Sequence, residues 1–244
     1  MPSAAPFDTR LVATRKLSPG VREMIFERVD GAPFLFDAGQ WVNLVLPLPE
    51  GDVRRAYSIA SAPSSTPRFE LAVTRVSGGP GSEYLHGLEV GAAVHAIGPH
   101  GLFTRAPLDP APALFIATGT GITPLRSMLH AALQAGSEAP MWILFGARFE
   151  EDILYRQEFT ELSRGSDRIR YDVTLSQGAA SWSGRRGYVQ EHVPGLLEEL
   201  SARSPGAPPH LYICGLERMV SAVRQLARGT LGVDRKRVHV ERYD

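Results

Sequence analysis

Two hydrophobic patterns divide the chain into two parts. Over residues 10–103, apolar and polar residues alternate in short runs such as 69–76, and glycines and prolines separate these runs. A period of two is typical of strands with one buried and one exposed face. Several short strands joined by turns predict an antiparallel β-barrel.

Beyond residue 112, apolar strands alternate with helices. Strands are expected at 113–117, 141–145, 169–175, 211–214 and 238–241. Helical spacing places two apolar sets on one face each: Leu125, Met128, Leu129, Ala132 and Leu133, then Leu216, Met219, Val220, Val223 and Ala227. This alternation predicts a C-terminal α/β domain with a doubly wound parallel sheet, which binds ligands at the carboxyl ends of its strands.

The segment 104–112 holds three prolines and is the expected linker. We therefore predict a barrel domain over 1–106 and an α/β domain over 107–244. A chain of 244 residues is long enough for two domains of ordinary size.

Composition narrows the possible partners. The 26 basic and 26 acidic residues cancel without long runs of one sign, so we expect no nucleic-acid partner and no membrane surface. Residues 1–9 lack the pattern of a secretory signal, and no segment approaches the roughly 18 consecutive apolar residues of a membrane span. These features predict a cytoplasmic protein without membrane insertion.

Cys214 is the only cysteine, which excludes an intrachain disulfide and an all-cysteine zinc or iron–sulfur site within this chain. The seven histidines show no metal-ligand spacing, so no metal site is expected. A Gly-x-Ser-x-Gly elbow is also absent, which leaves serine hydrolase chemistry without support.

The segment Gly-Thr-Gly-Ile-Thr-Pro, 119–124, follows an apolar strand. Its glycines let the backbone approach a ligand closely, and Thr123 is expected to cap a helix that begins at Pro124. Free amides and the helix dipole make such a turn a pyrophosphate site. The alternative is a tight turn without a ligand. A Walker-type lysine is missing, so an ATPase loses its main support.

Four further segments accompany this loop. They are Arg-Ala-Tyr-Ser at 55–58, Gly-Pro-Gly-Ser at 79–82, Gly-Pro-His-Gly-Leu-Phe at 98–103, and Cys-Gly at 214–215. With these five motifs in this order, nearly the whole chain resembles the ferredoxin–NADP reductase superfamily. The resemblance implies FAD, rather than FMN, as cofactor and NADPH or NADH as co-substrate.

The resemblance assigns the flavin to residues of the barrel. Arg55 offers a charged fork to the flavin phosphate, the Tyr57 ring lies on the isoalloxazine, and Ser58 places a hydroxyl near N5, where hydride arrives. The alternatives are a Tyr57 packed in the barrel, a Ser58 facing solvent and a flexible turn at 79–82. The implied flavin-binding set is Arg55, Ala56, Tyr57, Ser58, Gly79, Gly81 and Ser82.

The resemblance assigns the nucleotide to the α/β domain. Cys214 helps orient the nicotinamide; its alternative is a small buried hydrophobe. Glu241 supplies a carboxylate near the nicotinamide, and the Tyr243 ring covers the other face of the flavin. The implied nucleotide-binding set is Gly119, Thr120, Gly121, Thr123, Cys214 and Gly215, and the implied catalytic set is Ser58, Cys214, Glu241 and Tyr243.

Three residues match the family positions that meet a 2′-phosphate: Arg148, Gln177 and Arg185. Relatives specific for NADP commonly carry arginine where this chain has Gln177, which removes one positive charge. Arg148 and Arg185 could still bind the phosphate, so NADPH is slightly favoured over NADH. The alternative is that these arginines are solvated surface residues.

The first functional hypothesis is an FAD-dependent reductase. It accepts hydride from NADPH or NADH and passes electrons to an acceptor: a ferredoxin, a flavodoxin, an oxygenase component or free flavin. The second is a flavin-binding electron-transfer or regulatory subunit of a larger complex, with little turnover alone. Turnover with an artificial acceptor distinguishes the two. A third, a barrel that binds a ligand without redox activity, would require the motif matches to be accidental.

Overall fold

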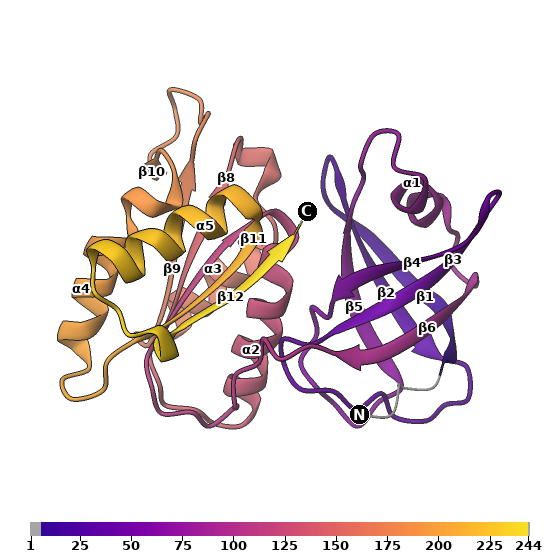
Figure 1. Ribbon diagram of the computed structural model, residues 1–244, viewed down its shortest axis with the longest axis horizontal. Coiled ribbons are helices and arrows are strands. Elements are labelled where there is room, and N and C mark those ends of the chain that lie inside the picture. The colour runs from indigo at the N-terminus through magenta and orange to yellow at the C-terminus, as the bar shows by residue number, and fades with distance from the viewer. Residues whose placement is uncertain (1–5, 244) are drawn as a thin grey trace.

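The computed structural model describes residues 6–243. Asp244, the residue beyond the aromatic Tyr243, lies outside this range. The two halves of the chain form two sheets that lie side by side, and β12 ends between them (Figure 1).

The first sheet contains six antiparallel strands in the order β4-β3-β6-β1-β2-β5. A bridge between Ile59 and Leu71 joins the end of β4 to β5 and closes the sheet. Its core contains Phe26, Leu44 and Phe69, which are fully buried. The predicted barrel is therefore confirmed. Its strands are β1 (Phe7–Ser18), β2 (Val21–Arg28), β3 (Trp41–Leu48), β4 (Gly51–Ser58), β5 (Arg68–Thr74) and β6 (Ala93–His100).

One helix of the barrel domain was not expected. Helix α1 (Pro80–Gly87) begins with Pro80 in its first turn and buries Leu85 in the barrel core. Pro80 suits this place because the first amides of a helix have no intrahelical partner. A helix of eight residues with one large buried side chain is too short to show a hydrophobic period.

The second sheet is parallel throughout, in the order β10-β9-β8-β7-β11-β12. All five predicted strands are present, and the two-residue β10 adds an edge that the sequence did not indicate. The strands are β7 (Ala113–Thr118), β8 (Met141–Ala147), β9 (Ile169–Leu175), β10 (Arg185–Arg186), β11 (His210–Leu216) and β12 (Val238–Tyr243).

Helices cover both faces of this sheet (Figure 1). Alternate strand residues enter two cores: Phe115 and Ile143 pack with α2 and α3, whereas Leu114 and Leu144 pack with α4 and α5. The doubly wound architecture is confirmed. The helices are α2 (Ile122–Gln134), α3 (Arg156–Gly165), α4 (Val193–Arg203) and α5 (Glu217–Gln225), and a π-helical turn, Leu226–Thr230, extends α5.

Leu216 corrects the predicted apolar face of α5. Met219, Val220, Val223 and Ala227 are buried as expected, but Leu216 is 58% exposed. Leu216 precedes the helix with ψ 137°, so the helical period does not apply to it.

The α2–α3 core continues into the barrel through Ala38, Ala72 and Phe103. The last strand of the barrel ends at His100 and the first strand of the parallel sheet begins at Ala113. A boundary between residues 106 and 107, which lies in this interval, remains our proposal. Within residues 6–243, no helix is long and apolar enough to cross a membrane.

Candidate functional site

The glycine-rich loop lies at the switch point of the parallel sheet. Strand β7 has β8 on one side and β11 on the other, so the turns after β7 and β11 meet at the carboxyl edge. A Cβ on Gly121 would lie 2.3 Å from the carbonyl oxygen of Cys214. At Gly215 (φ 141°), a Cβ would lie 2.4 Å from Thr118 Oγ1. Glycine is thus required for the contact between the two turns.

The predicted cap at Thr123 is wrong. Gly119–Gly121 form a 3₁₀ turn that runs directly into α2, so the helix begins at Ile122. The Thr123 hydroxyl donates to the carbonyl of Thr120 at 2.8 Å. The first backbone amides of a helical segment have no intrahelical partner. Because the 3₁₀ turn is itself helical, these amides lie near Gly119, one turn earlier than expected. A Cβ on Gly119 would meet no atom within 4 Å.

Ser58 joins the barrel to the last strand of the parallel sheet. Its Oγ donates to Glu241 Oε1 at 2.9 Å and accepts from the Tyr243 hydroxyl at 2.5 Å. Ser58 is the last residue of β4 and is only 7% exposed. The alternative of a solvent-facing Ser58 is therefore wrong.

Cys214 completes this group on the adjacent strand. Parallel pairing aligns it with Glu241, and its side chain is fully buried. Burial raises the pKa of the Cys214 thiol well above its usual value; the Glu241 carboxylate raises it further, and the Tyr243 hydroxyl partly offsets both effects. The thiol is therefore neutral at physiological pH. The four predicted catalytic residues lie together.

Glu241 is a carboxyl group with an unusual environment. Burial raises its pKa, and the hydrogen bond from Ser58 opposes this shift. A raised pKa brings its proton exchange nearer to neutral pH, which is a common property of acid–base groups in enzymes.

The two flavin motifs of the barrel face each other. A Cβ on Gly81 would lie 3.3 Å from Cγ of Arg55 and 3.2 Å from Cδ1 of Leu46. Gly81 therefore leaves room for the Arg55 side chain across the start of α1. Arg55 and Ala56 are exposed, whereas Tyr57 is partly buried against the barrel core, and burial raises its pKa to about 12.

Ser82 already has backbone partners. Its Oγ accepts from the Val76 amide at 3.0 Å and contacts the carbonyls of Val76 and Gly79 at 3.2 and 3.0 Å. The hydroxyl thus closes the turn that begins α1. Gly79 is the residue before that helix.

The three candidates for a 2′-phosphate lie along neighbouring strand ends. Arg148 and Gln177 follow β8 and β9, are exposed, and are joined by a 3.0 Å bond from the Gln177 amide to the Arg148 carbonyl. Arg185 is on β10, where its Nε donates to Asp172 Oδ1 at 3.0 Å. The Arg185 guanidinium is therefore partly neutralised, which the sequence could not indicate.

Two threonines were missed at the sequence level. Thr118 Oγ1 accepts from the Leu216 amide at 3.4 Å, and Thr74 at the end of β5 contacts Thr120 at 3.5 Å. Thr118 directly precedes the glycine-rich loop, so its place in the chain was a usable signal. The Thr74 contact crosses the domains and leaves no local pattern.

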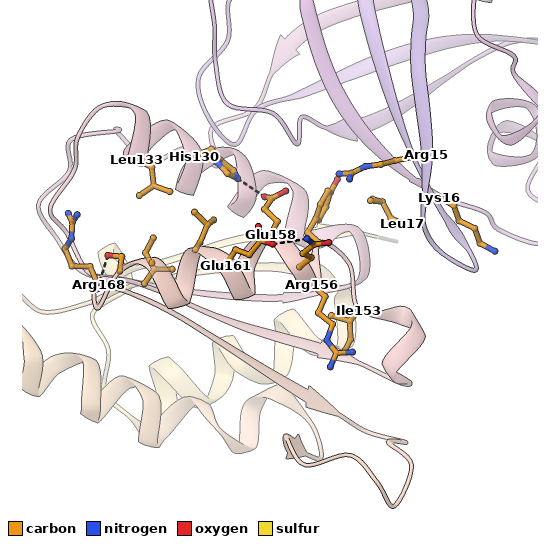
Figure 2. A pocket seen from close by; sticks show the side chains of 16 residues that line it. Arg15, Lys16, Leu17, His130, Leu133, Ile153, Arg156, Glu158, Glu161 and Arg168 are labelled. Atoms are coloured by element: carbon orange, nitrogen blue, oxygen red, sulfur yellow. Dashed lines mark hydrogen bonds and ion pairs between the residues drawn. The ribbon is translucent and has the colours of Figure 1, made fainter.

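A cavity of about 860 Å³ lies elsewhere, between β1 of the barrel and the helices α2 and α3 (Figure 2). It is lined by Arg15, Lys16, Leu17, His130 and residues of α3, none of which belongs to the predicted site. Within residues 6–243, no cluster of three or more histidine, cysteine or acidic residues could hold a metal.

Comparison with known proteins matches both halves of the chain. Residues 8–104 match the oxidoreductase FAD-binding domain, and residues 115–225 match the oxidoreductase NAD-binding domain. Over its full length the chain is 70% identical to ferredoxin–NADP reductase B of Sorangium cellulosum (strain So ce56), and the alignment covers 100% of both proteins. The chain belongs to the ferredoxin–NADP reductase family.

Two more distant relatives of the chain are longer. The reductase subunit Stc4 of stachydrine N-demethylase from Rhizobium meliloti is 31% identical over 93% of this chain, which spans 63% of that protein. The solved structure of the cytochrome P450 reductase GcoB from Amycolatopsis superimposes with a TM-score of 0.82 and 26% identity, over 98% of this chain and 69% of that one.

The cofactors of this ferredoxin–NADP reductase family member are FAD and a nicotinamide nucleotide. The donor groups fit both. Arg55 lies against the Gly81 backbone on the barrel, and at Gly119, at the switch point of the sheet, a Cβ would meet no atom within 4 Å.

Proposed function

We propose that this chain oxidises NADPH and reduces a ferredoxin. The observation that carries this proposal is the identity of 70% with ferredoxin–NADP reductase B over the full length of both chains. The same proposal assigns Arg55, Tyr57 and Gly79–Ser82 to the flavin, residues 119–121, Thr123 and 214–215 to the nucleotide, and Ser58, Cys214, Glu241 and Tyr243 to the reacting centre.

When bound, FAD supplies the redox chemistry: it accepts a hydride from the nicotinamide and releases the two electrons singly. The chain provides placement. Ser58 ends the strand that carries the flavin motif and, through Glu241 and Tyr243, contacts the strand beside Cys214. This contact supports a reacting centre in which the two cofactors meet at the domain boundary.

The side chains of this centre hold protons at defined atoms. Ser58 Oγ donates a hydrogen bond to Glu241 Oε1 and accepts one from the Tyr243 hydroxyl. We propose that Glu241 and Ser58 form a short proton path to the flavin edge. The buried, protonated Cys214 offers the nicotinamide a neutral contact, which excludes water without placing a charge beside the departing hydride.

The donor preference belongs to the same proposal. Of the two candidate arginines, Arg148 is exposed, whereas Arg185 shares its charge with Asp172. Gln177, beside Arg148, carries no charge. Arg148 is therefore the one arginine that we expect to bind the 2′-phosphate and to favour NADPH over NADH.

Anaerobic stopped-flow absorbance of the purified protein, mixed separately with NADPH and NADH, tests the reductase. We expect the bound flavin band to bleach rapidly, and faster with NADPH. Flavin that neither donor reduces would favour a subunit that works only inside a larger complex. Absence of flavin after reconstitution would overturn the assignment.

The acceptor is tested with the reduced protein. We expect reoxidation by a [2Fe–2S] ferredoxin to exceed reoxidation by flavodoxin or by free flavin at equal concentration. If only an oxygenase component accepts electrons, the ferredoxin assignment is wrong and the likeness to the stachydrine N-demethylase reductase subunit becomes the better guide. The cytoplasmic location is part of the proposal, and cell fractionation would test it.

A further inference from the structure

Arg126 of α2 reaches across the domain boundary. Its Nη1 donates to the carbonyl of Ala60 at 2.9 Å and to Glu70 Oε2 at 2.7 Å, and both partners belong to the barrel. The Arg126 side chain is 11% exposed and that of Glu70 is 27% exposed. Within the part of the chain that the structure describes, the pair of Arg126 with Glu70 is the ion pair that joins the two domains, and the others each lie within one domain.

Both ends of this bridge lie close in the chain to the reacting centre. On the barrel side, Ala60 is two residues beyond Ser58, and its amide donates to the Glu70 carbonyl at 2.7 Å, so β5 fixes its position. On the other side, Arg126 follows Thr123 by three residues, on the helix that the glycine-rich loop begins. A shift of this guanidinium relative to Ala60 would change the separation of the two cofactor sites.

The α/β domain holds the Arg126 side chain from the opposite direction. Its Nε donates to Glu158 Oε1 at 2.7 Å, the same oxygen contacts His130 Nε2 at 2.7 Å, and the guanidinium lies 4.6 Å from the centre of the Tyr155 ring. A guanidinium suits this position because its planar fork can serve carboxylates in two directions at once.

A cavity lies beside this bridge. It separates Arg15–Leu17 of β1 from α3, and Figure 2 shows Glu158 and His130 at its wall. It does not have the character of an anion site, because Arg15, Arg156 and Arg168 already pair with carboxylates. Apolar contact between the domains continues through Ala38, Ala72 and Phe103, and the polar bridge of Arg126 lies beside it, at the edge of the cavity.

We propose that Arg126 is a positioning residue for hydride transfer: by binding Ala60 and Glu70, it sets the distance between the end of the flavin strand and the glycine-rich loop. This inference rests on the proposed function. Small errors in the placement of reacting atoms are costly, on the order of 100-fold in rate for about 1 Å.

The two carboxylates around Arg126 provide matched variants. Glu70 lies in the other domain and Glu158 in the same domain, so E70Q weakens the bridge and E158Q weakens only the support within the α/β domain. Anaerobic stopped-flow at saturating NADPH gives the limiting rate of flavin reduction. We expect R126Q and E70Q to lower it about 10- to 100-fold, R126K to recover part of the loss, and E158Q to change it less than about threefold.

Binding measurements separate placement from local damage. We expect R126Q and E70Q to retain wild-type Kd values for FAD, which binds the barrel, and for adenosine 2′,5′-bisphosphate, which lacks the nicotinamide. Small-angle X-ray scattering of the same holoproteins should show a broader interdomain distance distribution in R126Q and E70Q than in E158Q.

The proposal is overturned if E158Q slows flavin reduction as much as E70Q, or if R126Q retains the wild-type limiting rate. Weakened binding of FAD or of the bisphosphate in R126Q would also overturn it, because the role would then be structural within one domain. A wild-type protein whose flavin NADPH does not reduce would contradict the proposed function instead, and the scattering comparison would still test the bridge.

Discussion

The four residues of the proposed reacting centre come from three strands. Ser58 ends β4, Cys214 lies in β11, and Glu241 and Tyr243 lie in β12. Burial keeps Cys214 protonated and raises the pKa of Glu241. At this scale the centre is a protonated thiol beside a carboxyl group whose pKa is raised, and the Ser58 hydroxyl links Glu241 to Tyr243.

Replacing Cys214 with alanine should slow flavin reduction about tenfold while FAD stays bound. The thiol lies in the parallel sheet rather than in the barrel, and its loss removes a contact that orients the nicotinamide. Stopped-flow absorbance gives the rate, and the flavin-to-protein ratio of the purified variant gives the occupancy. Loss of flavin in this variant would contradict the placement of Cys214 on the nicotinamide side.

Replacing Gln177 with arginine should strengthen the preference for NADPH over NADH about tenfold or more. The added guanidinium would lie beside Arg148, and a hydrogen bond to a charged group contributes about 1.5–3 kcal/mol. The ratio of kcat/KM values for the two donors measures this. Q225R at the exposed end of α5 carries the same charge change and should leave the ratio unchanged. An equal ratio in Q177R and wild type would remove Gln177 from the phosphate site.

Residue types and motif order were enough to bring Ser58, Cys214, Glu241 and Tyr243 into one hypothesis. They could not predict that Arg185 is paired with Asp172 or that Arg126 bridges the domains. Such pairs join residues that are distant in the chain, so their partners depend on the tertiary fold. The Thr123 cap failed for a local reason, because a glycine-rich turn can itself be helical.

At the scale of elements, the strand-to-helix turn after β7 is held against the end of β11. Strands β7, β8 and β11 were predictable because each is a short buried apolar segment, whereas β9 and β12 are mostly half-buried and mix apolar with polar residues. Helix α1 and strand β10 were not predictable, since eight and two residues give no readable period. The conformation of the glycine-rich loop depends on its contact with the end of β11, and this contact can be seen only in the structure.

Gly121→Ala tests this contact. The φ of −59° at Gly121 suits alanine, so the expected damage comes from the Cβ, which would lie 2.3 Å from the Cys214 carbonyl oxygen. We expect NADP⁺ affinity to fall at least tenfold and the free energy of unfolding to fall by about 1–3 kcal/mol. Isothermal calorimetry and thermal melts measure the two effects.

Gly195→Ala is the matched control. Gly195 lies in α4, and a Cβ there would meet no atom within 4 Å. Alanine should raise the free energy of unfolding by about 0.5–1 kcal/mol and leave nucleotide affinity unchanged. If G121A bound NADP⁺ as tightly as G195A, the close approach of the two turns would have no part in binding.

At the scale of the whole molecule, the contact of α3 with α2 behind the Arg126 bridge contributes to stability in a pH-dependent way. Burial alone would raise the pKa of Glu158, but hydrogen bonds from His130 and Arg126 outweigh it and lower the pKa to about 2. A lowered carboxyl pKa stabilises the fold above the ordinary value of 4.5, and this stability is lost as pH falls towards about 2.

Urea unfolding of wild type and E158Q between pH 7 and pH 3 tests this. Wild type should be more stable than E158Q by at most about 3 kcal/mol at pH 7, since each unit of pKa shift corresponds to about 1.4 kcal/mol. The difference should shrink below pH 4.5. A difference that is constant over this range would show that the ionised form of Glu158 gains nothing from Arg126 and His130.

The hydrogen bond between Ser58 and Glu241 joins residues 183 positions apart in the chain. Most strand pairs within each sheet connect segments that are much closer, so each domain can form while the loop between Ser58 and Glu241 is still open. In refolding from urea, recovery of flavin binding by the barrel should therefore precede recovery of NADPH oxidation. The interval between recovery of flavin binding and recovery of NADPH oxidation is the time that the two folded domains need to dock. This slow step is absent from the folding of either domain alone.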